Sequence, residues 1–253
     1  MVLDKPAGAS SAWLARRVQR ALGSGRGGHA GTLDPAATGV LVVLLGEATK
    51  LSQWIVGHDK TYRATVTLGR ATDTLDAEGQ TTAEAPVPPQ ALQPARIREV
   101  LAAMVGEIDQ VPPAYSAIKR DGRTLMSRAR AGERVACEPR RVVCHELTLE
   151  AVLGTSLAID VACGSGYYVR SLARDVGDAL GVPAHLSALR RTRSGPFDVA
   201  DSIAPEAVTE ASVRPLADAV PGLKTVTVSE AEVAAVAHGQ RIPAAGDDLR
   251  ALL

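Results

Sequence analysis

Residues 28–39 read GHAGTLDPAATG and stand between a glycine-rich segment and an apolar run, Val40–Leu45. Within this stretch Asp34 precedes Pro35, and a residue before proline is held out of the helical region in an extended or turn conformation. The Asp34 carboxylate is therefore predicted to lie on a constrained loop. An aspartate before proline commonly forms a turn or caps a helix, so the pattern by itself leaves open both that role and a catalytic one.

The glycines just upstream, GSGRGG at 23–28, match the G-x-G-x-x-G pattern of dinucleotide-binding loops. That pattern binds a pyrophosphate where it follows a strand and opens a helix. Here it follows a predicted helix that Ser10 or Ser11 caps, and it runs into the Asp34 loop. The sequence therefore argues against a dinucleotide site. The apolar face of the helix is predicted to hold Trp13, Leu14, Val18 and Leu22, opposite Arg16, Arg17 and Arg20.

The composition predicts an ordered protein with an aliphatic core and no membrane span. A chain of 253 residues, 46% of them hydrophobic, can bury a large core. Its apolar run at 40–45 is far shorter than the roughly 20 residues that cross a bilayer. No basic region followed by an apolar run stands at the N-terminus, so a cytoplasmic location is expected. Three cysteines without a C-x-x-C pair predict reduced thiols and no zinc site.

Strands and helices are mixed without regular βαβ alternation, which favours the α+β class. Apolar periodicity predicts strands at 40–45, 62–68 and 157–163 and helices at 97–105 and 170–180. From Pro196 onward the chain is rich in alanine and acidic residues and contains one expected strand, 225–228, and one expected helix, 229–238. These are too few elements for an independent domain.

The charge is balanced overall but segregated along the chain. There are 28 basic and 28 acidic residues, which argues against indiscriminate coating of polyanions. Residues 115–144 nevertheless carry eight basic against three acidic side chains, and residues 71–111 carry two against seven. Such blocks of like charge create local electrostatic fields even when the net charge is zero. The basic block is either a solvated face or a phosphate-binding surface, and the acidic residues near Asp76 do not fit a calcium loop and predict an ordered turn.

Eight segments, in the same order along the chain, resemble the TruB-type tRNA pseudouridine synthases of bacteria. They are LDKPAG at 3–8, GHAGTLDPAATG at 28–39, GEATK at 46–50, KTY at 60–62, DTLDAEG at 73–79, PPAYSAIK at 112–119, SGYYVR at 165–170 and LRR at 189–191. Together they cover roughly the first 195 residues.

The resemblance implies the pseudouridine-synthase fold, a long, mixed, mostly antiparallel sheet flanked by helices, over residues 1–195. It also implies a mobile basic segment at 115–144 that closes over RNA. Residues 196–253 are expected to form a linker and an incomplete PUA-like RNA-binding segment. The implied activity is conversion of uridine 55 in the T-loop of tRNA to pseudouridine, with the tRNA T-arm as partner, no metal, no cofactor and a monomeric enzyme. A noncatalytic tRNA-folding factor that grips the same T-loop is the alternative.

Six residues receive roles from the resemblance. Asp34 is the implied catalytic carboxylate, Tyr62 the aromatic that stacks on the target base, and Arg170 the cation paired with Asp34. Tyr168 and Leu189 are expected to line the uracil pocket, and His29 is expected to contact the RNA beside the vacated base position. Core packing is the alternative for the two tyrosines, and a solvated position is the alternative for His29.

The residue types suit the implied chemistry. Isomerising uridine breaks a C–N glycosidic bond, rotates the uracil and rejoins it through carbon. A carboxylate can act as nucleophile or charge stabiliser, as it does in glycosidases. An arginine within pairing distance favours the ionised carboxylate and fixes its orientation. Attack of Asp34 on the sugar C1′, attack on uracil C6 and assistance of a glycal intermediate all remain open.

Overall fold

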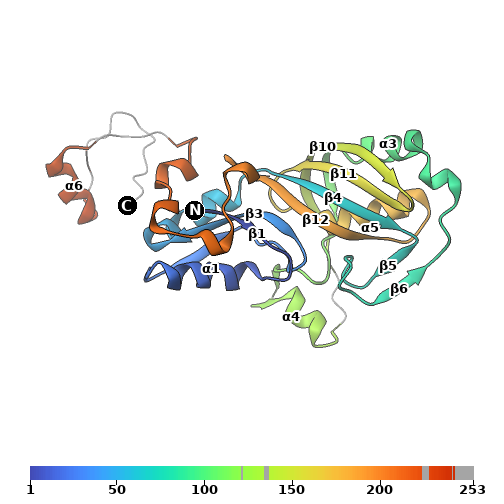
Figure 1. Ribbon diagram of the computed structural model, residues 1–253, viewed down its shortest axis with the longest axis horizontal. Helices are drawn as coiled ribbons and strands as arrows, with labels where there is room; N and C mark the ends of the chain where they lie inside the picture. Colours follow the sequence, from blue (N-terminus) through green and yellow to red (C-terminus); the bar gives the residue numbers. More distant parts are fainter. Residues whose placement is uncertain (121, 134–136, 224–227, 241, 243–253) are drawn as a thin grey trace.

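The computed structural model describes residues 1–120, 122–133, 137–223, 228–240 and 242. Its main sheet has nine strands and is mixed but mostly antiparallel, with helices packed on it (Figure 1). The central path runs β1 (Val2–Lys5), β3 (Thr38–Leu45), β12 (Ala184–Ser194), β4 (Lys60–Leu68), β11 (Ser156–Cys163), β10 (Arg140–Leu153) and β7 (Gly106–Gln110), while β2 (Gly27–Ala30) pairs with β3 and β13 (Phe197–Asp198) with β12. The predicted α+β class is confirmed.

The helices are α1 (Ser11–Ala21), α2 (Ser52–Val56), α3 (Pro94–Ala102), α4 (Leu125–Arg130), α5 (Val169–Leu180) and α6 (Glu230–Ala237). Two short hairpins, β5 (Arg70–Thr72) with β6 (Thr81–Glu84) and β8 (Lys119–Arg120) with β9 (Arg123–Thr124), lie outside the main sheet. The strands predicted at 40–45, 62–68 and 157–163 and the helices predicted at 97–105 and 170–180 are present, with one shortened end. α3 ends at Ala102 rather than at residue 105, and the chain then enters β7 through Gly106, whose φ of 107° suits glycine.

The apolar run at 40–45 is buried on both faces, which explains why it does not alternate with polar residues. One face of β3 packs with Val2, Ile55 and Phe197, and the other packs with Leu14 and Val18 of α1 and with Leu3. A third and larger core lies between the other half of the sheet and helices α3 and α5. The sheet therefore joins two differently packed halves.

Strand β12 connects the two halves. It pairs antiparallel with β4 and parallel with β3, where Arg191 is the partner of Gly39. A Cβ atom on Gly39 would lie 2.1 Å from the Arg191 carbonyl oxygen, and the glycine has a φ of 97°. Only a residue without a side chain fits this contact. The loop that precedes β3, which carries Asp34, is thereby brought against the half of the sheet that carries α5.

The prediction that Trp13 lies on the buried apolar face of α1 is wrong. The helix buries Leu14 and Val18, as expected, but Trp13 is 49% exposed. Successive helical residues are turned by about 100°, so with Leu14 and Val18 at the centre of the buried stripe the side chain of Trp13 falls outside it.

The packed body extends past the boundary expected at residue 195. Phe197 is buried in the core beside β3, and Ala219 joins the same cluster. Ile203 pairs with Leu3 at the edge strand β1. Residues 197–220 therefore lie on the sheet rather than forming a connector. Helix α6 matches the expected helix and has a capping box between Ser229 and Glu232, whereas most of the strand expected at 225–228 lies outside the described residues.

No helix in the described part of the chain has the length and apolarity to cross a membrane.

Candidate active site

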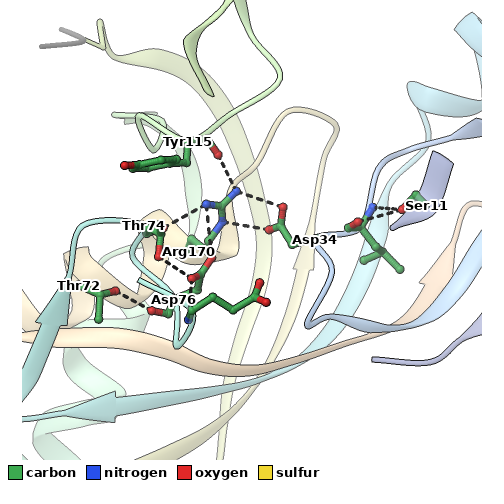
Figure 2. Close-up of polar contacts among 9 residues, drawn as sticks. Ser11, Asp34, Thr72, Thr74, Asp76, Tyr115 and Arg170 are labelled. Carbon is green, nitrogen blue, oxygen red and sulfur yellow. Dashed lines mark hydrogen bonds and ion pairs between the residues drawn. The ribbon is translucent and has the colours of Figure 1, made fainter. Parts of the chain in front are cut away.

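Asp34 lies on a tight turn between β2 and β3 that the N-terminal helix holds in place. The Ala37 N–H donates to the Asp34 carbonyl oxygen at 3.1 Å, closing a turn with Pro35 at its second position. The Ser11 hydroxyl both donates to the Leu33 carbonyl and accepts from the Leu33 N–H, each at 2.9 Å (Figure 2). The residue directly before Asp34 is thus fixed at both of its backbone groups.

Lys5 holds the other side of the same turn. Its buried ammonium group donates to the carbonyl oxygens of Pro6, Pro35 and Ala37 at 3.0, 2.8 and 2.6 Å. Burial lowers the pKa of Lys5 to about 8, and the Asp34 carboxylate acts in the opposite direction. The main chain of the loop is anchored by these bonds, which leaves the Asp34 side chain for other contacts.

Arg170, in the first turn of α5, makes a two-bonded ion pair with Asp34 (Figure 2). Its Nε lies 3.0 Å from Oδ2, and its Nη2 donates to Oδ1 at 3.3 Å. The Arg170 side chain is 7% exposed, whereas the Asp34 side chain is 35% exposed. The buried arginine therefore orients a carboxylate that solvent or a substrate can still reach.

The remaining donors of Arg170 are also engaged. Nη1 donates to the Thr74 carbonyl at 3.1 Å, and Nη2 donates to the Tyr115 carbonyl at 3.0 Å. The Asp76 carboxylate lies 3.5 Å from Nη1. The guanidinium thus joins the Asp34 loop, the turn after β5 and the segment that begins at Tyr115, three stretches far apart in the sequence.

Asp76 is a site residue that the sequence interpretation missed. The ordered acidic turn predicted there is present, with the Thr74 hydroxyl donating to Asp76 Oδ1 at 2.6 Å and the Thr72 hydroxyl donating to the Asp76 carbonyl at 2.6 Å (Figure 2). The turn directs this carboxylate at Arg170. The available signal was its position within DTLDAEG, one of the segments that carry the resemblance.

The ionisation of Asp34 depends on opposing influences. Burial is the largest and raises the pKa of Asp34, while the Arg170 guanidinium beside it lowers the pKa. The Asp76 carboxylate raises the pKa further, and Lys5 lowers it. Without Arg170 the ionised form would be disfavoured by both burial and a like charge.

A small cleft of about 30 Å³ opens beside the pair. Asp34, Asp76 and Arg170 form one wall, and β12 residues 186–189, Leu189 among them, form another. Its walls combine the Asp34 and Asp76 carboxylates and the Arg170 guanidinium with mostly aliphatic side chains, and its volume is about that of one water molecule.

Tyr168 precedes Arg170 at the start of α5 and is held by its backbone. The buried Gln110 amide accepts from the Tyr168 N–H at 2.8 Å and donates to its carbonyl at 3.2 Å. Burial raises the pKa of Tyr168, and both Arg170 and Asp34 affect this pKa, so the phenol lies within electrostatic reach of the pair.

Tyr62 lies on β4, opposite Arg191 on β12, and packs against the larger core while remaining partly exposed. Burial raises the pKa of Tyr62, the nearby Arg191 guanidinium lowers it, and Asp34 has a weaker raising effect. The half-buried ring is consistent with both a packing role and a role in contacting a base.

Arg191 is the second residue that the sequence interpretation did not assign. It is 1% exposed. Its Nε donates to the Val40 carbonyl at 2.7 Å, and its Nη2 donates to the Gly31 carbonyl at 3.0 Å. It thereby ties β12 to the strand after the Asp34 loop and to the segment before it.

His29 lies on β2 and is separated from the cleft. It is absent from the described residues that line the cleft. Burial lowers the pKa of His29, and Arg191 lowers it further, which favours the neutral ring. The structure therefore brings Asp34, Arg170 and Leu189 to one cleft, places Tyr62 and Tyr168 within electrostatic reach of Asp34, and leaves His29 outside the lining.

In the described part of the chain no three His, Cys, Asp or Glu side chains are arranged to hold a metal ion. The charged groups at the cleft are arranged around an arginine instead.

Two family models together match residues 19–219 of this chain. The model of the TruB family pseudouridylate synthase N-terminal domain matches residues 19–169, and that of the tRNA pseudouridylate synthase B C-terminal domain matches residues 170–219. A protein named tRNA pseudouridine synthase B from Azoarcus sp. (strain BH72) is 43% identical over 96% of this chain and 82% of its own length. One of the same name from Thermobifida fusca (strain YX) is 44% identical over 97% of this chain and 87% of its own length.

A solved structure, the "Crystal Structure of a Cbf5-Nop10-Gar1 Complex", contains a chain with a TM-score of 0.69 and 30% identity, covering 94% of this chain and 67% of that one. The predicted pseudouridine-synthase fold and the resemblance are both confirmed. The family models, the two full-length relatives and the shared fold together show that this chain belongs to the TruB family of pseudouridylate synthases.

Proposed function

We propose that this chain isomerises uridine 55 in the T-loop of tRNA to pseudouridine. The observation that carries the proposal is the two-bonded Asp34–Arg170 ion pair at the edge of the cleft lined by Leu189. Membership of the family supports the reaction type, and the names of the relatives from Azoarcus and Thermobifida support tRNA as the substrate.

The reaction begins with the target nucleotide leaving its stack, which costs a few kcal/mol. Stacking of the displaced base on an aromatic ring contributes roughly 1 to 3 kcal/mol in return. Tyr62 supplies that ring in the proposal, while Leu189 and Tyr168 bound the space that the uracil occupies. His29 contacts the RNA near the position that the base has left.

Asp34 then promotes cleavage of the bond between N1 of uracil and C1′ of the ribose. The uracil turns beside Asp34 and C5 bonds to C1′. C5 loses its proton and N1 gains one, so the overall change is an isomerisation. Arg170 keeps Asp34 ionised and oriented in the proposal, and Asp76 and the Thr74 and Tyr115 carbonyls keep Arg170 in place.

Residues 115–144 act as the RNA clamp in this proposal. The segment contains the β8–β9 hairpin and α4, and its glycines Gly122 and Gly132 have φ angles of 79° and 78°, which provide points at which the segment can bend. Arg123 and Arg128 both pair with Glu133, at 2.8 and 2.7 Å.

The clamp contacts the T-arm, and α6 with the residues after it contributes a PUA-like contact to the tRNA. A monomer is sufficient, because one chain supplies every proposed site residue.

The test is tritium release from a transcribed tRNA that carries uridine labelled at C5. We expect the wild-type chain to release one equivalent of tritium per tRNA, and substitution of uridine 55 in the transcript to abolish release. Retained tRNA binding without any release would overturn the proposal in favour of the noncatalytic tRNA-folding factor.

A further inference from the structure

Trp13 exposes a large aromatic surface at the start of α1. Its side chain is 49% exposed. Among the exposed large apolar side chains in the described part of the chain, Trp13 is the aromatic one, and the others are valines and leucines. Its backbone is well fixed, since the Trp13 N–H donates to the capping Ser10 hydroxyl at 3.2 Å. Trp13 thus presents a large aromatic side chain from a fixed helical backbone, and aromatic faces of this kind stack on the bases of single-stranded nucleic acid.

The surroundings of Trp13 are cationic. The Arg17 guanidinium lies over the indole ring, 5.5 Å from its centroid. Arg16 and Arg20 are also exposed on α1, and among the described residues no carboxylate pairs with any of these three arginines. The first turn of α1 carries no acidic residue. An aromatic ring among unpaired cations suits a polyanion with π faces better than it suits an ordinary protein surface.

Trp13 is also close to the candidate active site. Ser11, two residues earlier, is bonded to Leu33, the residue before Asp34 (Figure 2). Helical geometry and the reach of a serine side chain then place the Cα of Trp13 no more than about 16 Å from that of Asp34, while the indole lies on the solvent face of α1, opposite the face that carries Ser11. Figure 1 shows α1 and α4, which belongs to the proposed clamp, on the same side of the sheet.

We propose that Trp13 and Arg17 form an RNA contact in which the indole stacks on an unpaired base near the target nucleotide, while Arg16 and Arg20 neutralise adjacent phosphates. Arg17 lies over one face of the ring and leaves the rest of the indole for the base. The inference rests on the proposed function, because it takes tRNA as the substrate. It adds a stacking surface distinct from Tyr62, which lies on β4.

The two tryptophans of this chain, Trp13 and Trp54, allow a direct test by fluorescence. Trp54 is partly buried against the core beside β3. In a Trp54→Phe variant all tryptophan emission comes from Trp13. We expect titration with an unmodified tRNA transcript to change this emission and to saturate at the concentration that saturates filter binding. A Trp13→Phe variant, which keeps Trp54, is expected to show little change.

Affinity provides the second measurement. Trp13→Ala is expected to weaken tRNA binding about 5- to 150-fold, the range for loss of one stacked base, and to raise KM more than it lowers kcat. Trp13→Phe keeps an aromatic face and is expected to retain most of the affinity. Alanine favours helix, so circular dichroism should be unchanged. The matched control is Leu153→Ala, which truncates a 65% exposed apolar side chain at the end of β10, and its affinity should equal that of the wild type.

The outcomes separate this inference from the proposed function. Normal turnover with unchanged affinity in Trp13→Ala and constant Trp13 emission would overturn the inference and leave the function intact. A tRNA-dependent emission change without tritium release in the wild type would overturn the function and leave the contact. An emission change on raising the protein concentration without RNA, together with a dimer in sedimentation, would assign Trp13 to contact between two copies and overturn the inference.

Discussion

Two buried arginines, Arg170 and Arg191, are used in different ways. Arg170 bonds two carboxylates, Asp34 and Asp76, in addition to backbone carbonyls. The hydrogen bonds of Arg191 go to the carbonyls of Val40 and Gly31, and its guanidinium acts on the Tyr62 phenol. The first arrangement affects the pKa of Asp34 and orients its carboxylate. The second ties strands together, so burial of an arginine by itself does not identify a catalytic role.

The largest effect is expected from Asp34→Asn, which removes the group that Arg170 orients. The isosteric amide keeps the turn but removes the negative charge, so turnover should fall by at least about 10⁴-fold, a typical loss for an essential catalytic side chain. Affinity for tRNA should remain within a few-fold of the wild type. Single-turnover pseudouridine formation measures the first quantity and filter binding the second. Turnover close to that of the wild type would show that Arg170 orients something other than the catalytic group.

Arg170→Met and Arg191→Met test the comparison directly. Arg170→Met leaves two carboxylates without their cation and should lower the free energy of unfolding by about 3–5 kcal/mol near neutral pH. Arg191→Met leaves the Val40 and Gly31 carbonyls without these donors, at about 1–3 kcal/mol for each. Denaturant unfolding measures both losses. Because the two losses are of similar size near neutral pH, their dependence on pH distinguishes the two sites.

The pH dependence of the same variants sharpens the distinction. Arg170 lowers the pKa of Asp34, so its removal should raise that pKa and move the acidic limb of the pH–rate profile to higher pH. Arg170 stabilises the ionised Asp34 carboxylate, and the stability cost of Arg170→Met should therefore shrink as pH falls and that carboxylate becomes protonated. In Arg191→Met the acidic limb should stay close to that of the wild type. An acidic limb that shifts equally in both variants would contradict this account.

Tyr62 lies opposite Arg191 but is proposed to act on the base. Tyr62→Phe keeps the ring and should bind tRNA within about two-fold of the wild type, whereas Tyr62→Leu should weaken binding about 5- to 150-fold through loss of stacking. Loss of turnover in Tyr62→Phe with normal binding would assign the hydroxyl a second role as proton acceptor at C5. Wild-type binding and turnover in both variants would reduce Tyr62 to a core residue.

The smallest effect is expected for two arginines of the clamp, Arg123, which is exposed, and Arg128, which is partly buried. Changing Arg123 and Arg128 together to Gln should reduce the slope of log affinity against log salt by up to about 1.4–1.8, at roughly 0.7–0.9 per phosphate contact. Glu133→Gln is the matched variant, because it releases both arginines from their ion pairs, and it should steepen the slope. Identical slopes for all three proteins would return this segment to a solvated face.

Local chemistry in the sequence predicted much of the site. Asp34 was expected on a constrained loop because proline restricts the residue before it, and the structure places it on a turn. The buried strand at 40–45 followed from an unbroken apolar run. The six residues with implied roles came from segments that carry the resemblance, and the structure brings three of them to one cleft.

The resemblance implied the pairing of Arg170 with Asp34, but the rest of the arginine-centred network was decided by tertiary structure. Asp76 was predicted in an acidic turn, but its orientation toward Arg170 depends on the packing of that turn on β12, where the Leu186 N–H donates to the Leu75 carbonyl at 3.0 Å. The role of Arg191 depends on the close parallel contact of β12 with β3 at Gly39. The exposure of Trp13 depends on which face of α1 meets β3. Sequence patterns record local conformation and periodicity, whereas these contacts join residues up to 160 positions apart, and only the folded chain determines which of them meet.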